Sequence, residues 1–341
     1  MTSDWRKFGK FCLLALCLPL MTSAAAHDRI RHRSARNHHY NHDNELEKRF
    51  EERCAKYAEN VYQLSPDPVL LLGAKPKKQD TCGIISQPTI VGGELASARE
   101  FPHMALIGYG DYPIRWRCAG SLINERWVIS AAHCTVTADN LVAKYVLLGD
   151  LNVTSNIDER QHKAEPKIYQ IVGHRNHPDY KKPLVYNDIA LYKLNQTVEF
   201  NRFVRPICLH GGTSVQDGTA LASGWGATEN RNFSPHLLKV GLDLTDNEKC
   251  NKAYSQNDYQ IRKHFRAGIN ESVQICASGV GKDTCKGDSG GPLQQVLKTP
   301  YCMYSLIGVT SVGLKCAEAA PGVYTRVRHY LNWIESTAFL N

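Results

Sequence analysis

Three short stretches of the sequence hold side chains that could together perform nucleophilic catalysis. They are Ser130-Ala-Ala-His133-Cys134, Asn187-Asp188-Ile-Ala-Leu191 and the glycine-rich Gly287-Asp288-Ser289-Gly290-Gly291. A serine hydroxyl is a weak nucleophile, so it needs a base to take its proton, and the base needs a carboxylate to hold its tautomer. A lone histidine is usually structural and a glycine-rich turn is common, but all three stretches in one chain predict a serine-hydrolase site made of His133, Asp188 and Ser289.

The first 26 residues have the order of a secretory signal peptide. Arg6, Lys7 and Lys10 precede the apolar run 11–20, and Ala24-Ala25-Ala26 then gives way to charged residues. The alternative is a membrane anchor, but the apolar run is shorter than the roughly 20 residues that a spanning helix needs, and it contains Pro19. We therefore expect a signal peptide over 1–26, a secreted, extracellular product and no membrane partner.

The composition fits a globular protein. Hydrophobic residues make up 43% of the chain and charged residues 22%, which excludes a wholly disordered or fibrous protein. The net charge of +8 is not concentrated in any one segment. A nucleic-acid partner is therefore not expected.

The segment before residue 90 divides into a tail, a helix and a linker. Residues 27–44 are polar and rich in His and Arg, which predicts a disordered tail, with metal binding by the histidines as the alternative. A helix is predicted over 43–64 and should end before Pro66, because apolar residues recur there at helical spacing: Leu46, Phe50, Cys54, Tyr57 and Val61. A linker then runs to Thr89.

From Ile90 onward, short β-favouring runs alternate with turn residues. Such runs occupy 127–130, 145–148, 189–192 and 306–310, and helical spacing returns only at 330–334. Many short strands between turns are typical of an all-β sandwich or barrel.

Ten cysteines remain after a signal peptide is removed. An even number in a secreted chain predicts five disulfides, and no C-x-x-C pair supports a metal site. Four sequons also predict a glycoprotein, at Asn152, Asn195, Asn232 and Asn270.

Residues 90–341 resemble the chymotrypsin/trypsin family of serine endopeptidases over essentially their whole length. Besides the three stretches above, the resemblance is carried by Ile90-Val-Gly-Gly93, Gly224-Trp-Gly226, the run 283–292 and Pro321-Gly-Val-Tyr-Thr-Arg326. It implies two antiparallel six-stranded β-barrels with a C-terminal helix and the catalytic residues between the barrels.

The resemblance also implies a role for each site residue. Ser289 would be the nucleophile, His133 the general base, and Asp188 the carboxylate that orients it, with the N–H groups of Gly287 and Ser289 as the oxyanion hole. The substrate pocket would be lined by Asp283, Ser311, Gly313 and Gly322. A buried carboxylate at Asp283 implies cleavage after Arg or Lys.

In this family, cleavage before Ile-Val-Gly-Gly frees an α-amino group that pairs with the aspartate preceding the nucleophile. Here the cut would fall between Thr89 and Ile90, and Ile90 would pair with Asp288 to order the oxyanion hole. Residues 27–89 would then be a propeptide and 90–341 the protease domain. Since Thr89 is not basic, we expect a different protease to activate the chain.

The resemblance pairs eight of the ten cysteines, as Cys118–Cys134, Cys250–Cys276, Cys285–Cys316 and Cys82–Cys208. Cys54 and Cys302 are left over and are predicted to pair with each other. The alternative for these two is free thiols or an intermolecular bond.

The layout is most similar to that of insect snake-type and clip-domain proteases of extracellular cascades, through Arg53-Cys-Ala-Lys-Tyr57 and the non-basic Thr89. A clip domain needs six cysteines and residues 27–89 hold two, so no folded clip domain is expected. The implied partners are another secreted zymogen as substrate, an upstream activating protease and a serpin inhibitor.

Two other functions are weighed, a catalytically dead homologue acting as an adaptor and a digestive trypsin. No cofactor is predicted. No metal is predicted either, because the second carboxylate that a calcium-binding loop would need falls at Arg160.

Overall fold

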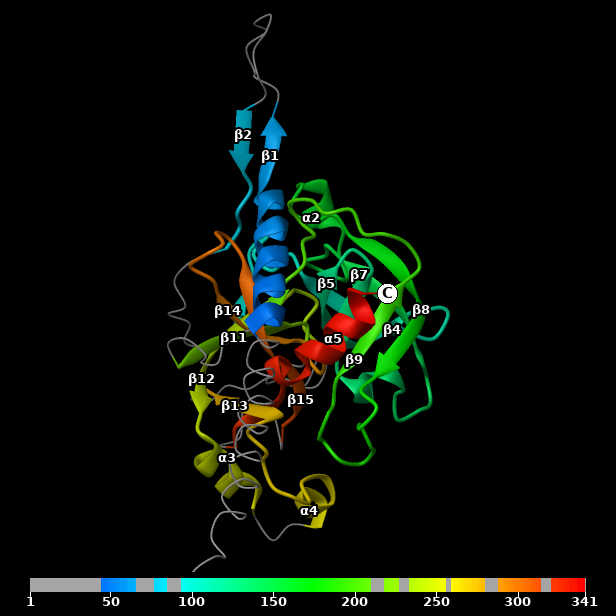
Figure 1. Cartoon of the computed structure of the whole chain (residues 1–341). Helices are drawn as coiled ribbons and strands as arrows, with labels where there is room; N and C mark the ends of the chain where they lie inside the picture. The colour runs from blue at the N-terminus through cyan, green and yellow to red at the C-terminus, as the bar shows by residue number, and fades with distance from the viewer. Residues whose placement is uncertain are drawn as a thin grey trace, which may run out of the picture. The chain divides into compact units, whose positions relative to one another are not determined.

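Most of the described chain after residue 93 folds into two closed barrels of antiparallel strands. The computed structural model describes residues 44–65, 77–84, 93–209, 218–226, 233–255, 259–279, 288–313 and 320–340. The chain divides into two units, Met1–Glu45 and Leu46–Asn341, and both barrels belong to the second unit (Figure 1).

The first barrel closes through six strands. Their order is β4 (Met104–Tyr109), β5 (Arg115–Asn124), β6 (Trp127–Ser130), β9 (Ala190–Leu194), β8 (Lys167–Asn176) and β7 (Ala143–Leu148), with β7 pairing back to β4. Every residue of β4 and β6 is buried, so both faces of these strands are covered. Full burial explains why the run 127–130 is continuously apolar rather than alternating.

The second barrel is built in the same way from later residues. Its strands follow the order β11 (Thr219–Gly224), β12 (Leu238–Thr245), β13 (Gln274–Ser278), β16 (Gly322–Arg326), β15 (Tyr304–Val312) and β14 (Pro292–Val296), and β14 pairs with β11. Two short strands extend it: β3 (Glu94–Leu95) pairs with β12, and β10 (Cys208–Leu209) runs parallel to β15. Within the described residues, the prediction of two six-stranded antiparallel barrels is confirmed.

Short helices occupy the connections and the end of the chain. They are the 3₁₀ turns η2 (Ala132–Thr135) and η3 (Val327–Tyr330) and the α-helices α2 (Ile157–Arg160), α3 (Asn247–Tyr254), α4 (Tyr259–His264) and α5 (Leu331–Ala338). The C-terminal helix α5 is the predicted one. None of the helices in the described ranges has the length and apolar character needed to cross a membrane.

A further helix precedes the barrels and covers residues 44–58; we call it the N-terminal helix. The predicted apolar stripe is its buried face, since Leu46, Phe50, Cys54 and Tyr57 are all less than 10% exposed. The helix ends earlier than predicted. A 3₁₀ turn, η1 (Glu59–Val61), leads into β1 (Tyr62–Ser65), because β1 pairs with β2 (Lys77–Asp80) in an antiparallel hairpin.

The N-terminal helix binds α5 through one buried carboxylate. Glu335, with a side chain only 5% exposed, accepts hydrogen bonds from Arg49 Nε and Nη2 at 2.8 Å and from Arg53 at 3.2 Å. The Arg53 guanidinium also lies 4.6 Å from the ring centroid of Phe339, and the rings of Phe50 and Phe339 pack edge to face. Charge-assisted and aromatic contacts together therefore fix this helix to the C-terminal helix.

Two disulfides tie the segment before residue 90 to the barrels, but with partners other than those predicted. The prediction of Cys82–Cys208 and Cys54–Cys302 is wrong, because the structure contains Cys54–Cys208 and Cys82–Cys302. Cys54 lies on the buried face of the N-terminal helix, where it packs beside Cys208 and Met303.

Cys82 follows β2, and contacts near it explain its partner. Tyr301 donates a hydrogen bond of 2.9 Å to Asp80, which brings Cys82 beside Cys302. The other bonds in the described residues are Cys118–Cys134 and Cys250–Cys276, the pairs that the resemblance implied. Cys285 and Cys316 lie outside the described residues.

The contacts of Glu335 generate a stability prediction. Glu335→Gln removes the charge that binds Arg49 and Arg53, and we expect the free energy of unfolding at pH 7 to fall by about 2 kcal/mol. Arg49 and then Arg53 hold the pKa of the Glu335 carboxyl below its ordinary value. The stabilisation is therefore present above the ordinary carboxyl pKa and is lost as the pH falls through the lowered one.

Glu52→Gln is the matched control, because Glu52 is 65% exposed and lies 3.9 Å from Lys48 only. It should change the free energy of unfolding by less than about 0.5 kcal/mol. Denaturant unfolding of both variants at pH 7 and pH 3 checks the prediction. Equal effects of the two substitutions at pH 7 would contradict it.

Candidate active site

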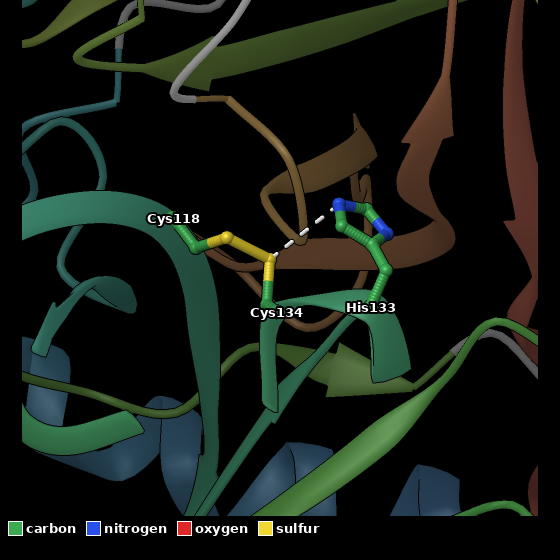
Figure 2. A group of neighbouring side chains, drawn as sticks. All are labelled: Cys118, His133 and Cys134. Atoms are coloured by element: carbon green, nitrogen blue, oxygen red, sulfur yellow. Dashed lines mark hydrogen bonds between the residues drawn. A yellow bond between two sulfur atoms is a disulfide. The ribbon is translucent and has the colours of Figure 1, made fainter. Parts of the chain in front are cut away.

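His133 lies in a short turn that a disulfide holds in place. It is the second residue of η2, which follows β6 directly, and the next residue, Cys134, is bonded to Cys118 on β5 (Figure 2). Tyr109 fixes the turn from inside the first barrel, since its hydroxyl donates to the carbonyl of Cys134 at 2.5 Å. The turn is thus anchored on both sides while the His133 side chain remains 32% exposed.

Asp188 is buried two residues before β9 and binds His133 twice. Its Oδ2 lies 2.7 Å from His133 Nδ1, and its Oδ1 accepts from the His133 backbone N–H at 2.9 Å. A carboxylate can only accept, so this geometry assigns the proton to Nδ1 and leaves Nε2 able to take another. The carboxylate side chain is 3% exposed.

The second barrel also holds Asp188. Ser311 on β15 donates to Oδ2 at 2.6 Å, and Thr325 on β16 donates to the Asp188 carbonyl at 2.8 Å. Burial alone would raise the carboxyl pKa, but His133 and then Ser311 outweigh it, and the pKa of Asp188 lies below its ordinary value. Burial likewise tends to lower the pKa of His133, and the charge and hydrogen bond of Asp188 raise it overall.

The residue before Asp188 has a conformation that needs support. Asn187 has φ of 56°, in the left-handed region that asparagine tolerates better than most residues. Tyr330 in η3 donates to Asn187 Oδ1 at 2.8 Å, and Asn187 donates to the Asp179 carbonyl at 3.3 Å. Asn187, Thr325 and Tyr330 were not predicted as supports. The asparagine directly before Asp188 was the one sequence signal that could have indicated such a role.

Ser289 lies in a turn that presses against the first barrel beside His133. The carbonyl of Ser289 accepts from Ala119 N–H on β5 at 2.8 Å, and Cys134 Sγ lies 3.5 Å from the same oxygen. The serine is therefore brought next to the histidine turn by backbone contacts. In the described residues no hydrogen bond joins Ser289 Oγ to His133 Nε2, which lies 3.7 Å from Cys134 Sγ. Catalytic hydrogen bonds often tighten only when substrate is bound.

Gly290 makes this close approach possible. It has φ of 81°, and a Cβ built there would lie 2.0 Å from Ser130 Oγ and 2.5 Å from the Ala119 carbonyl. Both clashes involve groups that already bond each other, since Ser130 donates to Ala119 at 2.7 Å. Any side chain at 290 would therefore push the Ser289 turn away from His133.

The Asp288 side chain lies against the glycine turn of residues 224–226. Its Oδ1 accepts from Gly226 N–H at 2.8 Å, and a Cβ at Gly224 or Gly226 would lie 2.0 or 2.2 Å from the carboxylate. This contact explains why Gly224-Trp-Gly226 has glycine at both ends. Ile90, the predicted partner of Asp288, lies outside the described residues.

The described pocket positions lie on neighbouring strands. Ser311 is buried on β15, Gly313 follows that strand, and Gly322 begins β16, which pairs with β15 through Val312 and Val323. Ser311 thus contacts Asp188, and the two glycines are the sequence neighbours of the paired residues Val312 and Val323. Asp283, Gly287 and Thr89 lie outside the described residues.

One group of side chains near the site has the composition of a metal site. Ligand atoms of Cys118, His133 and Cys134 all lie within 4.8 Å of one another. The two sulfur atoms are joined in a disulfide (Figure 2), and metal binding by cysteine requires a thiolate. This cluster therefore anchors the histidine turn and is not a metal site.

Comparison with known proteins agrees with this arrangement. The family model described as Trypsin matches residues 90–334. Serine protease snk of Drosophila melanogaster is 40% identical over 266 residues, 74% of this chain and 58% of its own length, so the chain spans less than two thirds of that relative. CLIP domain-containing serine protease B4 of Anopheles gambiae is 35% identical over 76% of this chain and 72% of its own length.

A third relative is Phenoloxidase-activating factor 3 of Holotrichia diomphalia, which is 35% identical over 74% of both chains. The chain therefore belongs to the trypsin family of serine proteases and is related to insect snake and clip-domain cascade proteases.

Proposed function

We propose that the chain is a secreted serine endopeptidase, made as a zymogen, that hydrolyses peptide bonds after Arg or Lys in protein substrates. The observation that carries the proposal is the doubly bonded His133–Asp188 pair beside the turn that bears Ser289. Family membership supports the reaction class, and the sequence motif around Asp283 supports the preference for basic residues.

In the proposed mechanism, Ser289 Oγ attacks the scissile carbonyl carbon while its proton passes to His133 Nε2. Nε2 then gives this proton to the leaving nitrogen, the C–N bond breaks, and an acyl ester remains on Ser289. A water molecule loses a proton to Nε2 and attacks the ester, which releases the acid and returns a proton to Ser289. Asp188 stays ionised and stabilises the imidazolium, and the N–H groups of Gly287 and Ser289 bind the oxyanion.

We assign substrate selection to Asp283, at the base of a pocket with Ser311, Gly313 and Gly322 on its walls. Burying an unpaired carboxylate in a narrow pocket costs free energy, and a bound Arg or Lys side chain offsets this penalty by pairing with the charge. The absence of a Cβ at the two glycines leaves room for a long side chain. The pairing of β15 with β16 supports this assignment.

We further propose that residues 1–26 are a signal peptide and 27–89 a propeptide, with activation by cleavage between Thr89 and Ile90. The new α-amino group of Ile90 would pair with Asp288 and order the loop that carries Gly287. Asp288 supports this role, because the Gly226 N–H donates to its Oδ1 at 2.8 Å and holds the carboxylate in a defined position.

A place in an extracellular cascade follows from two features. One is the name of a relative, Phenoloxidase-activating factor 3. The other is Thr89, which an enzyme specific for basic residues would not cut, so activation would need an upstream protease. We propose another secreted zymogen as substrate and a serpin as inhibitor.

Two alternatives are weaker. An adaptor without catalysis usually lacks one of the three catalytic residues, whereas His133, Asp188 and Ser289 are all present. A digestive trypsin should have a short propeptide with a basic last residue. Here the segment before Ile90 ends in Thr89 and is held by two disulfides.

A peptide-library cleavage profile of protein cut before Ile90 tests the proposal. We expect cleavage after Arg and Lys, and none after Thr. Asp283→Ser should lower kcat/KM for these substrates by at least 100-fold, because an unpaired cation would enter the pocket. A profile without basic preference, unchanged turnover in Asp283→Ser, or efficient cleavage after Thr would contradict the specificity and the need for an upstream activator.

The His133–Asp188 pair generates a pH prediction. Because Asp188 raises the pKa of His133, kcat/KM should rise with pH through a value above the ordinary 6.5 as His133 loses its proton. Asp188→Asn removes the charge, so burial should then shift this step to lower pH, while kcat falls by about 10⁴-fold, the loss known for the same change in the family's template enzyme. A pH–rate step at the same position in both proteins would contradict the role of Asp188.

A further inference from the structure

A group of five basic side chains lies exposed on α4, just after α4, and on the segment that leads to Asp188. We call it the α4 basic surface, and it consists of Lys181, Lys182, Arg262, Lys263 and Arg266. Figure 1 shows α4 beside the loop between β8 and β9 that contains the two lysines. No established part of the proposed mechanism uses these residues.

The two segments that carry this surface are packed together. Ile261 and Phe265 on and after α4 are buried in one apolar cluster with Val185. Val185 N–H donates to the His264 carbonyl at 3.4 Å, and His264 Nδ1 lies 2.5 Å from the Pro183 carbonyl. The buried side chains of α4 fix its orientation, so Arg262 and Lys263 are held outward on a defined base.

The surface borders the candidate active site. Lys182 Nζ donates to the carbonyl of Val136 at 3.2 Å, three residues after His133. Five residues after Lys182 the same segment reaches Asn187, which is followed by Asp188. A protein seated in the site would therefore pass close to these cations.

Basic residues outnumber acidic residues around this surface. Residues 258–271 contain Arg262, Lys263 and Arg266 against Asp258 and Glu271, and residues 177–187 contain Lys181 and Lys182 against Asp179. Among the described residues, none of the five basic side chains forms an ion pair, whereas Arg117 and Lys144 on the first barrel each bind an aspartate. An excess of like charge held on one surface favours an acidic partner and attracts it from a distance.

We propose that the α4 basic surface binds an acidic segment of the protein substrate. The inference rests on the proposed peptidase function and adds to it a second recognition element outside the pocket. Ion pairs at an exposed surface contribute modestly and are screened by salt. The surface should therefore act on KM rather than kcat, and mainly at low ionic strength.

The test compares peptides that share one Arg-containing cleavage core and carry four Glu or four Gln on either side of it. In 50 mM NaCl, at least one Glu peptide should show a KM about 3- to 10-fold below that of its Gln counterpart. Arg262→Ala/Lys263→Ala should abolish this difference, as should 0.5 M NaCl. Lys163→Ala/Lys167→Ala, which removes the same charge from exposed positions on the first barrel, should keep it.

Turnover of the core peptide alone separates the two proposals. If wild-type protein cut before Ile90 cleaves the core, but Glu and Gln peptides have equal KM or the preference persists in Arg262→Ala/Lys263→Ala, the surface proposal is wrong. If the core is not cleaved, the peptidase proposal fails, and fluorescence anisotropy of labelled Glu peptide on Ser289→Ala protein still tests the surface.

Sulfated polysaccharide is the other ligand that this chemistry fits. Retention on heparin that depends on Arg262 and Lys263, without any preference for Glu peptides, would overturn the proposal in favour of a polysaccharide site.

Discussion

The buried carboxylate of Asp188 is the constraint on which the candidate site depends. An ionised group that is 3% exposed is stable only when its oxygens are fully bonded. The partners of the carboxylate come from both barrels: His133 from η2 in the first and Ser311 from β15 in the second. Thr325 on β16 adds a hydrogen bond to the backbone carbonyl of Asp188. The hydrogen bonds that stabilise the Asp188 carboxylate therefore also join the two barrels, and they set the tautomer of His133.

The position of Ser289 depends on a second contact between the barrels, at Gly290. Its backbone N–H donates to Thr310 in the second barrel at 2.8 Å, while its missing side chain leaves room for Ser130 in the first. Asp188 and Gly290 act together, since one orients the imidazole and the other keeps the serine turn against the histidine turn. Neither barrel alone holds all of these groups.

Residues 46–65 and 77–84 belong to the same folded unit as the barrels. The N-terminal helix is fixed by Glu335 on α5, and Cys54 and Cys82 are bonded to Cys208 and Cys302. Cleavage after Thr89, as proposed, would leave this segment attached by two disulfides and by the buried face of its helix. The N-terminal helix would thus remain packed against the C-terminal helix α5 in the activated enzyme.

Much of the fold and of the candidate site could be predicted from the sequence, wherever a physical rule links the type of a residue to its place in the structure. The apolar stripe from Leu46 to Tyr57 identified the buried face of a helix, and the motifs around His133 and Asp188 identified groups that do meet. The disulfide partners of Cys54 and Cys82 could not be predicted, because spacing does not say which wall of the barrel a helix or a hairpin contacts. The support of Asn187 by Tyr330 joins residues 143 apart and depends on how η3 packs.

The central claim is that Ser289, His133 and Asp188 act as one catalytic unit. The most direct measurement is the crystal structure of protein cut before Ile90 and reacted with an arginine-like organophosphonate. We expect phosphorus bonded to Ser289 Oγ, with His133 Nε2 within hydrogen-bond distance of the adduct and Asp188 still bound to Nδ1. An unmodified Ser289, or an adduct that leaves His133 out of reach, would contradict it.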